Sequence, residues 1–215
     1  MKVCVILLFA VAGILLSAEE PVRTWTDLDG KTIQASFIKF KGKDIVIRRA
    51  DGKLFQVHPS YFSTQDRKYL FEMSVLIRSK QPVHFKDDQL ETLIRKSLNK
   101  AEGDLTRADM AKLLDLTTPP GARIADLSGI EHAVNLNKLS LGYNKITDVK
   151  PLVGLDKLKR LDLKYNHLTD AVLLGNMEGL QYLVLHGNRI KSDQKKLLER
   201  ALPNCKIKFT PQFAP

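Results

Sequence analysis

The sequence contains few cysteines, and this scarcity limits both its cross-links and its metal chemistry. Cys4 and Cys205 are the two cysteines among 215 residues. Cys4 lies in an N-terminal apolar segment that we expect to be removed, so the mature chain keeps one thiol. One thiol excludes an intrachain disulfide and a zinc site built on paired cysteines. Cys205 alternates with Ile207 and Phe209, which predicts a buried structural thiol in a strand.

Motifs that mark catalytic, cofactor or metal sites are also missing. None of the five histidines belongs to a His-Glu-x-x-His motif. There is no Gly-x-Ser-x-Gly sequence, phosphate loop or dinucleotide fingerprint. The acidic pair Asp87-Asp88 lacks the spacing of a calcium loop and is better explained as a helix cap. We therefore expect a non-enzymatic protein with no catalytic residue, no cofactor and no metal site.

The chain is basic, with a formal net charge of +10 and a pI of about 9.6. No run of lysine and arginine exceeds two residues, and no aromatic-rich nucleic-acid signature is present, so we expect no nucleic-acid partner. Two explanations of the charge stay open. One is a solvated basic surface, and the other is contact with acidic polysaccharide or anionic lipid.

The N-terminus has the features of a targeting segment. Lys2 precedes an apolar run over residues 3–16, and Leu16-Ser17-Ala18 resembles a cleavage site. The run is shorter than the roughly 20 residues that span a membrane. We predict a signal peptide over residues 1–18 and export to the periplasm, the cell envelope or the exterior. No integral span then remains in the mature chain. An uncleaved membrane anchor is the alternative.

Residues 22–72 have the pattern of a small β module. Asp-Gly pairs at 29–30 and 51–52 are strong hairpin signals, and apolar residues alternate between them. Ser63 is the expected N-cap of a short helix that continues through Met73.

Three motifs in this stretch resemble a known family. They are R-T-W-T-D-x-x-G-K from Arg23, A-D-G-K from Ala50, and S-x-x-D-x-x-Y-L from Ser63. Together they are similar to the Sla-type homology domain 1, and this resemblance implies an SH3-like barrel. Trp25 is either part of its core or a platform for a bound peptide.

Residues 82–110 are predicted to form a helical cap, after a polar, proline-broken joint at 79–82. Asp87 or Asp88 begins one helix. Thr106 begins a second helix in a capping box with Asp109. The apolar residues of the second helix are Ala108, Met110, Ala111 and Leu114.

Three lines of sequence repeat at a fixed spacing. Each reads L-x-x-L-x-L-x-x-N-x-[IL], and they begin at Leu136, Leu158 and Leu180, so the period is 22 residues. This is the signature of a leucine-rich repeat, in which one apolar face per copy becomes buried by stacking. The segment I-T-D-V-x-P-L-x-G-L over 146–155 resembles the 22-residue internalin repeat. The cap over 82–110 is similar to the N-terminal cap of internalin-like proteins.

The array is predicted over residues 111–209. Its degenerate first copy places Leu114-Asp115-Leu116 on the strand and Pro119 at the asparagine position, with three extra residues. A helix from an N-cap at Ser192 to about Leu202 and a last strand close the array, before a tail over 210–215. The helix residues expected to point inward are Leu197, Leu198 and Ala201. The predicted fold class is therefore α+β and multi-module, with an SH3-like β-barrel, a helical cap and an α/β repeat solenoid.

Strand residues that alternate with the leucines should form the concave face of such a stack. Tyr143 and Tyr165 are one period apart, so their rings should lie side by side. We predict that this face binds a protein or a cell-envelope polymer, and that the protein is a monomer. The alternatives are that these are merely exposed strand positions, or that the basic surface holds a structural protein to acidic polysaccharide or lipid. The candidate binding residues are Lys138, Tyr143, Arg160, Asp162, Lys164, Tyr165, Tyr182 and His186.

Overall fold

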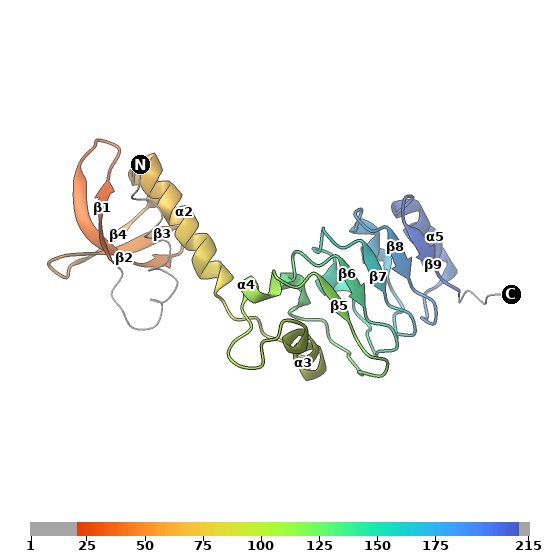
Figure 1. The fold of residues 1–215 in the computed structure, drawn as a ribbon. Coiled ribbons are helices and arrows are strands. Elements are labelled where there is room, and N and C mark those ends of the chain that lie inside the picture. The colour runs from red at the N-terminus through yellow and green to blue at the C-terminus, as the bar shows by residue number, and fades with distance from the viewer. Residues whose placement is uncertain (1–20, 211–215) are drawn as a thin grey trace, which may run out of the picture. The chain divides into compact units, whose positions relative to one another are not determined.

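The structure is a computed structural model that describes residues 21–210 (Figure 1). The chain divides into two compact units at the Arg78–Ser79 bond, named here the N-terminal unit and the repeat unit. The predicted signal peptide over 1–18 lies outside the described residues, as do residues 211–215 of the predicted tail. No helix within 21–210 is long and apolar enough to cross a membrane.

The N-terminal unit contains an antiparallel meander in which each strand pairs with the next one in sequence. The predicted Asp-Gly turns connect strands, and Gly30 and Gly52 take the positive φ angles, 80° and 83°, that suit glycine. After the last strand, a 3-10 helix leads to Phe62, which forms an isolated bridge with Asp27 beside the first strand. An SH3-like barrel here stays a prediction. The elements are β1 (Val22–Thr26), β2 (Thr32–Lys41), β3 (Asp44–Arg49), β4 (Leu54–Val57), η2 (Pro59–Tyr61) and α2 (Thr64–Ser79).

Trp25 is the centre of the N-terminal core. Its side chain is fully buried, and its indole Nε1 donates to the carbonyl oxygen of Ala35 at 2.9 Å. The prediction of a core tryptophan is confirmed, and a peptide platform at this residue is excluded. Arg23 stacks its guanidinium 3.8 Å from the ring centre of Tyr69 and donates to Asp66 at 2.7 Å. This pairing satisfies the buried carboxylate of Asp66.

Helix α2 is longer than the sequence predicted. It continues past Met73 to Ser79, because Leu76 and Ile77 also pack against the core of the N-terminal unit. The predicted Ser63 cap is present, since the backbone N–H of Asp66 donates to the Ser63 hydroxyl at 3.2 Å. Ser79, the first residue of the predicted joint over 79–82, is therefore the last residue of the helix.

The repeat unit is a parallel five-stranded sheet with strands in sequence order, β5-β6-β7-β8-β9, visible in Figure 1 from green to blue. Short 3-10 helices connect the first four strands, an α-helix connects the last two, and two α-helices precede the sheet. The cap and first repeat contain α3 (Asp88–Ser97), α4 (Arg107–Met110), β5 (Asp115–Thr117) and η3 (Ile130–His132). The next two repeats contain β6 (Lys138–Ser140), η4 (Lys150–Leu152), β7 (Arg160–Asp162) and η5 (Val172–Asn176). The end contains β8 (Tyr182–Val184), α5 (Ser192–Ala201) and β9 (Lys206–Lys208).

One continuous apolar core runs through the cap and all the repeats. The repeating leucines are its members; Leu136, Leu161 and Leu183 have no exposed surface. The caps of the helices follow the prediction: Asp87 accepts the backbone N–H groups of Gln89 and Leu90, and Thr106 and Asp109 form a complete capping box. The leucine-rich-repeat fold is confirmed.

The turn asparagines connect consecutive repeats. Asn144 and Asn166 are buried, and each uses its side-chain oxygen to accept a backbone N–H from the preceding repeat at 3.0 Å. Their side-chain nitrogens donate to carbonyls of their own strand ends. Asn188 makes the same two kinds of bond. The polar groups of a sharp buried turn are thereby satisfied.

The register of the first repeat corrects the sequence prediction. Leu116 lies opposite Leu139, so it occupies the first buried strand position and not the second. Leu114 is 58% exposed, whereas Leu113 is buried. The reason is that α4 ends at Met110, and the chain then enters β5 two residues out of the expected phase.

The corrected register also changes the count of inserted residues. Eight positions separate Leu116 from Ile124, and seven separate Leu139 from Ile146, so the first repeat has one extra residue rather than three. Counted back from Ile124, the asparagine position falls on Ala122 and not on Pro119.

The C-terminal helix differs from prediction at both its start and its inner face. Its N-cap is Lys191 and not Ser192, and no side chain caps it. Leu198 and Leu202, four residues apart, are buried against the array, while Leu197 is 49% exposed. Ala201 is exposed as well. The observed inner face is thus rotated by about one residue from the predicted one.

Cys205 is half-buried rather than fully buried. It packs against the edge of the core beside Ile207 and Phe209, and this burial raises the pKa of its thiol. A thiol with a raised pKa is a weak nucleophile, which agrees with a structural role.

Candidate functional site

The parallel register places the predicted strand residues in two cross-strand rows. The central residue of each strand points into the core, so its two neighbours point to the opposite face. Consecutive strands are about 4.8 Å apart. The first row is Asp115, Lys138, Arg160, Tyr182 and Lys206. The second row is Thr117, Ser140, Asp162, Val184 and Lys208.

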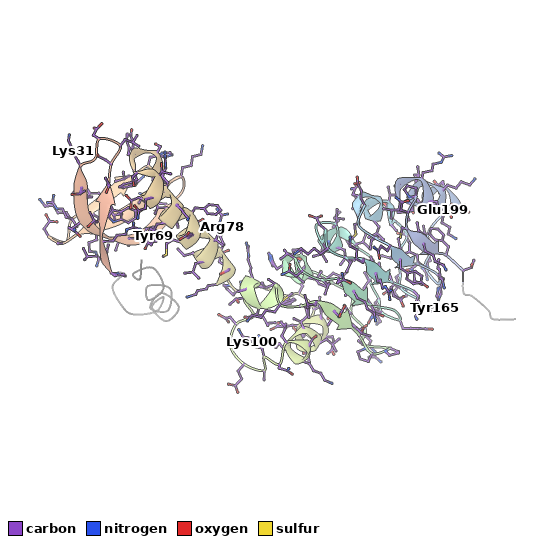
Figure 2. The ribbon with its side chains drawn as sticks, turned by 45° about the horizontal axis from the view of Figure 1, so that its top comes forward. Lys31, Tyr69, Arg78, Lys100, Tyr165 and Glu199 are labelled. Carbon is purple, nitrogen blue, oxygen red and sulfur yellow. The ribbon has the colours of Figure 1, made fainter. Side chains whose placement is uncertain are left out.

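Beyond the carboxyl ends of the strands lies a strip of aromatic side chains, named here the aromatic strip, which consists of Tyr143, Tyr165 and His186. The tyrosine rings stack with centroids 4.6 Å apart and an interplanar angle of 22°, as the sequence predicted. The His186 ring meets Tyr165 edge-on at 5.1 Å. Tyr143 and Tyr165 remain 47% and 41% exposed. Tyr165 is labelled in Figure 2.

Both tyrosines hold a backbone conformation that favours glycine. Their φ angles are +60° for Tyr143 and +49° for Tyr165. The next repeat has Gly187 at this position, with φ +74°, and the first repeat has Gly121, counted back from Ile124, with φ +77°. For a bulky side chain this left-handed conformation costs roughly 1–2 kcal/mol. Two repeats thus carry tyrosine where the neighbouring repeats carry the less strained residue.

The Tyr165 ring lies directly against the backbone of Gly187. A Cβ atom at Gly187 would come within 2.4 Å of that ring. The stacked ring and the small residue beyond it therefore fit together, and Gly187 is needed for two reasons, its φ angle and the space it leaves.

Charged side chains surround the strip. Lys164 extends over Gly142, with its Nζ 3.3 Å from the Asp162 carboxylate and 5.6 Å from the centre of the Tyr143 ring. Lys208 Nζ lies 5.4 Å from the centre of the Tyr182 ring. Such ammonium–ring contacts are favourable and hold both partners in place.

The structure groups the eight predicted residues in two sets. Tyr165 contacts both Tyr143 and His186, with Lys164 and Asp162 beside them. The other three lie on neighbouring strands of the first row: Lys138, Arg160 and Tyr182.

Sequence reasoning missed Lys206 and Lys208, which continue the two rows on β9. The L-x-x-L-x-L-x-x-N pattern stops before this strand. The alternation of Lys206 and Lys208 around Ile207 was the available signal.

His186 contains an unsatisfied polar atom. Its Nδ1 is buried and has no hydrogen-bond partner among residues 21–210. A buried ring nitrogen without a partner is unfavourable.

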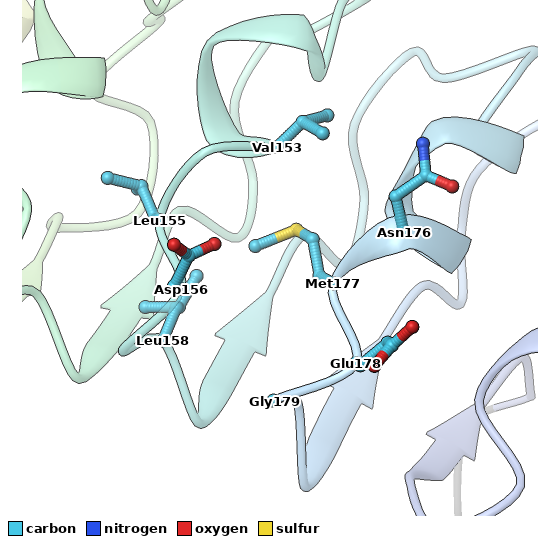
Figure 3. Close-up of a pocket in the computed structure, with 8 residues that line it drawn as sticks. All are labelled: Val153, Leu155, Asp156, Leu158, Asn176, Met177, Glu178 and Gly179. Carbon is cyan, nitrogen blue, oxygen red and sulfur yellow. The ribbon is translucent and has the colours of Figure 1, made fainter.

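A pocket of about 260 Å³ lies apart from this surface (Figure 3). It is formed by the segments that precede β7 and β8, and Asp156 and Glu178 occupy equivalent positions of successive repeats at its wall. No group of three His, Cys, Asp or Glu residues suited to a metal ion occurs in the described part of the chain. None of the eight predicted residues lines this pocket.

Comparisons with known proteins agree on the repeat unit. The family model described as leucine rich repeat matches residues 134–190. An internalin from Listeria monocytogenes is similar in structure, with 30% sequence identity and a TM-score of 0.52, over 59% of this chain and 37% of the internalin. No curated protein matches the chain.

Two further solved structures match smaller parts. A leucine-rich-repeat protein of Leptospira interrogans shares 34% identity over 49% of this chain and 28% of its own, with a TM-score of 0.42. The structure of two domains of ZmpB from Clostridium perfringens shares 34% identity over 42% of this chain and 19% of its own, with a TM-score of 0.38. The matches span well under half the length of these proteins. The chain thus contains leucine-rich repeats and is structurally similar to an internalin.

Proposed function

We propose that the chain is a non-enzymatic, exported protein that recognises a protein partner through the aromatic strip and the two cross-strand rows. The observation that supports this most is the pair of stacked tyrosines in left-handed conformation. They strain the backbone at positions where Gly187 and Gly121 show that glycine suffices for the fold. Strain of this kind is found mostly where a side chain is needed for function.

The chemistry of the surface suits recognition. Tyrosine and arginine are the residues most often responsible for binding energy at protein interfaces, because they combine large area with polar groups. Stacked repeats present these residues on an extended face held rigid by the sheet. The array is short, so we expect a small interface of modest affinity.

The test replaces both tyrosines with glycine in the mature chain, residues 19–215. Tyr143→Gly/Tyr165→Gly removes the rings but keeps the left-handed backbone in its preferred residue, so the variant should remain folded. Partners from envelope extract would be captured on wild type and variant and identified by mass spectrometry. The control is Val134→Ala/Leu197→Ala, which removes exposed apolar surface elsewhere on the repeat unit.

We expect a partner that wild type and control retain and the glycine variant loses. Equal capture by all three would contradict the proposal. If that equal capture also disappeared at raised salt, the basic surface would be the better explanation, with acidic polysaccharide or lipid as its ligand.

For the N-terminal unit we propose an SH3-like barrel. The return of the chain through η2 to the Phe62–Asp27 bridge supports it, as do the Asp-Gly turns. The proposal of export rests on residues 1–18. Mass spectrometry of the protein purified from its source would show a chain that begins at Glu19. A chain that keeps residues 1–18 would favour the anchor.

A further inference from the structure

The first row carries three cations that no carboxylate neutralises. Lys138, Arg160 and Lys206 are exposed, and none of them forms an ion pair or side-chain hydrogen bond within residues 21–210. The second row has one acid, Asp162, and Lys164 already pairs with it at 3.3 Å. Asp115, at the end of the first row, is the remaining acid of the two rows. The face therefore has a surplus of positive charge that an anionic ligand would balance.

The register fixes how these cations are spaced. Lys138 and Arg160 lie on neighbouring strands, Tyr182 follows on the next strand, and Lys206 lies on the strand beyond. Three strand spacings place the outer cations about 14 Å apart. An extended peptide rises about 3.3 Å per residue, so its positions i and i+4 are about 13 Å apart and share one face. A strand-like segment that crosses the row would thus match it in length.

The aromatic strip favours a peptide over a sugar chain. A sugar ring stacks on an open aromatic face, but Tyr165 has Tyr143 on one side and the Gly187 backbone on the other. Tyr143 has Tyr165 on one side, and Lys164 Nζ lies 5.6 Å from its ring centre. The Tyr165 ring therefore offers its edge and hydroxyl group, which suit the backbone and side chains of a protein.

We propose that the first row binds an extended acidic segment of the partner, with carboxylates at alternate positions facing Lys138, Arg160 and Lys206. Arg160 can hold a carboxylate through two parallel hydrogen bonds, whereas the lysines act as point charges. Tyr182, between Arg160 and Lys206 in the row, packs against the backbone of the segment. This inference rests on the proposed function, because it names the chemistry of the partner on the same face.

The probe is a labelled nine-residue peptide with glutamate and threonine in alternation. Its binding to residues 19–215 is measured by fluorescence anisotropy at two salt concentrations. The row variant is Lys138→Glu/Arg160→Glu/Lys206→Glu. The matched control, with the same change of charge, is Lys150→Glu/Lys191→Glu/Lys196→Glu, whose three residues are exposed and lie outside both rows. Circular dichroism confirms that each variant is folded.

We expect the row variant to bind at least tenfold more weakly than wild type and the control to change by less than threefold. The neutral variant Lys138→Gln/Arg160→Gln/Lys206→Gln should fall between them. A peptide of equal composition with its glutamates in one block should bind more weakly than the alternating peptide, because fewer carboxylates then meet the row.

Three results would overturn the inference. They are no binding of the alternating peptide, equal losses in row variant and control, and tighter row-dependent binding of an oligogalacturonate of equal charge. Each would leave the tyrosine-dependent capture experiment untouched, so a failure here is distinct from a failure of the proposed function.

Discussion

Asn166 shows how one side chain can hold two repeats together. It is 3% exposed, accepts the backbone N–H of Ile146 at 3.0 Å, and donates to the carbonyls of Leu141 and Leu163 at 2.9 and 3.0 Å. Asn166→Ala would leave these buried groups unpaired. We expect a loss of about 3 kcal/mol in the free energy of unfolding, measured with urea.

Asn176→Ala is the control for this prediction. Asn176 is exposed at the end of η5, so its replacement should change stability by less than about 0.5 kcal/mol. Equal effects of the two substitutions would show that the turn bonds contribute little.

The sequence predicts the role of Asn166 but not the conformation of Tyr165. The asparagine recurs at a fixed place beside leucines, and its amide suits a turn. A tyrosine carries no local signal of a positive φ angle, because its own preference is against one. Only the glycine at the same position of the next repeat, Gly187, hints at it.

Gly129 tests how the cap is joined to the array. It precedes η3 with φ +100°, and a Cβ there would come within 2.6 Å of the Phe85 ring. Gly129→Ala should therefore destabilise the repeat unit by about 3 kcal/mol, through backbone strain together with overpacking. Urea unfolding followed by circular dichroism measures it.

Gly121→Ala separates the two causes. Gly121 also has a positive φ, +77°, but a Cβ there would meet nothing within 4 Å. Gly121→Ala should lower the free energy of unfolding by about 1 kcal/mol. If both substitutions cost the same, the contact with Phe85 is not important for stability.

The start of α4 should make stability depend on pH. Burial alone would raise the pKa of the Asp109 carboxyl, but hydrogen bonds from Lys100, Thr106 and Lys112 outweigh it and hold that pKa well below its usual value. A lowered pKa means that the ionised carboxylate stabilises the folded state. That contribution is complete above the unfolded pKa of about 3.9 and is lost as the pH falls toward the folded value.

Asp109→Asn should accordingly be less stable than wild type at pH 6. The difference in stability between the two proteins should shrink as the pH falls below about 4, because other groups titrate alike in both proteins. The measurement is the urea midpoint of the repeat unit between pH 6 and pH 2.5. A gap that stays constant would contradict the assigned role of Asp109.

The elements that could be predicted were those marked by a regular sequence period or a local motif. The 22-residue spacing gave the strands and their parallel order, and the capping box at Thr106 gave the start of α4. The phase of the first repeat was not predictable, because Leu113 and Leu114 are chemically alike and only the turn after Met110 decides which one is buried. The same reason applies to Leu197 and Leu198: the two side chains are alike, so the sequence could not predict which of them is exposed.

The two units have separate cores, and the chain provides a probe for one of them. Trp25 is the single tryptophan and belongs to the core of the N-terminal unit, while Leu161 is fully buried in the core of the repeat unit. We expect Leu161→Ala to destabilise the repeat unit by about 2–5 kcal/mol, seen by circular dichroism. The denaturant midpoint of the tryptophan fluorescence transition should not change.

A shift of the fluorescence transition together with the circular dichroism signal would mean that the two units unfold as one. The reverse control is Trp25→Phe, which should weaken the N-terminal unit and leave the repeat unit's own transition unchanged.

The sequence predicts a division into modules, because Asp-Gly hairpin signals in the first part give way to the 22-residue leucine period in the second. The ligand could not be predicted, because the candidate binding residues occupy positions that any exposed strand also has. The cationic row became visible only when the register put Lys206 beside Tyr182, since the repeat pattern ends before β9.

The constant 22-residue period determines how this surface can change in evolution. Each of the repeats that begin at Leu136, Leu158 and Leu180 contributes one strand, one asparagine bridge and one position before that asparagine, which holds either glycine or tyrosine. An in-frame duplication of the 22 codons of the repeat that begins at Leu136 or at Leu158 would add one tyrosine ring to the stack and one cation to the row, while leaving the caps at both ends intact. The proposed binding face can therefore lengthen or shorten by whole repeats through gene duplication or deletion, and Gly187 marks the end of the stacked tyrosines.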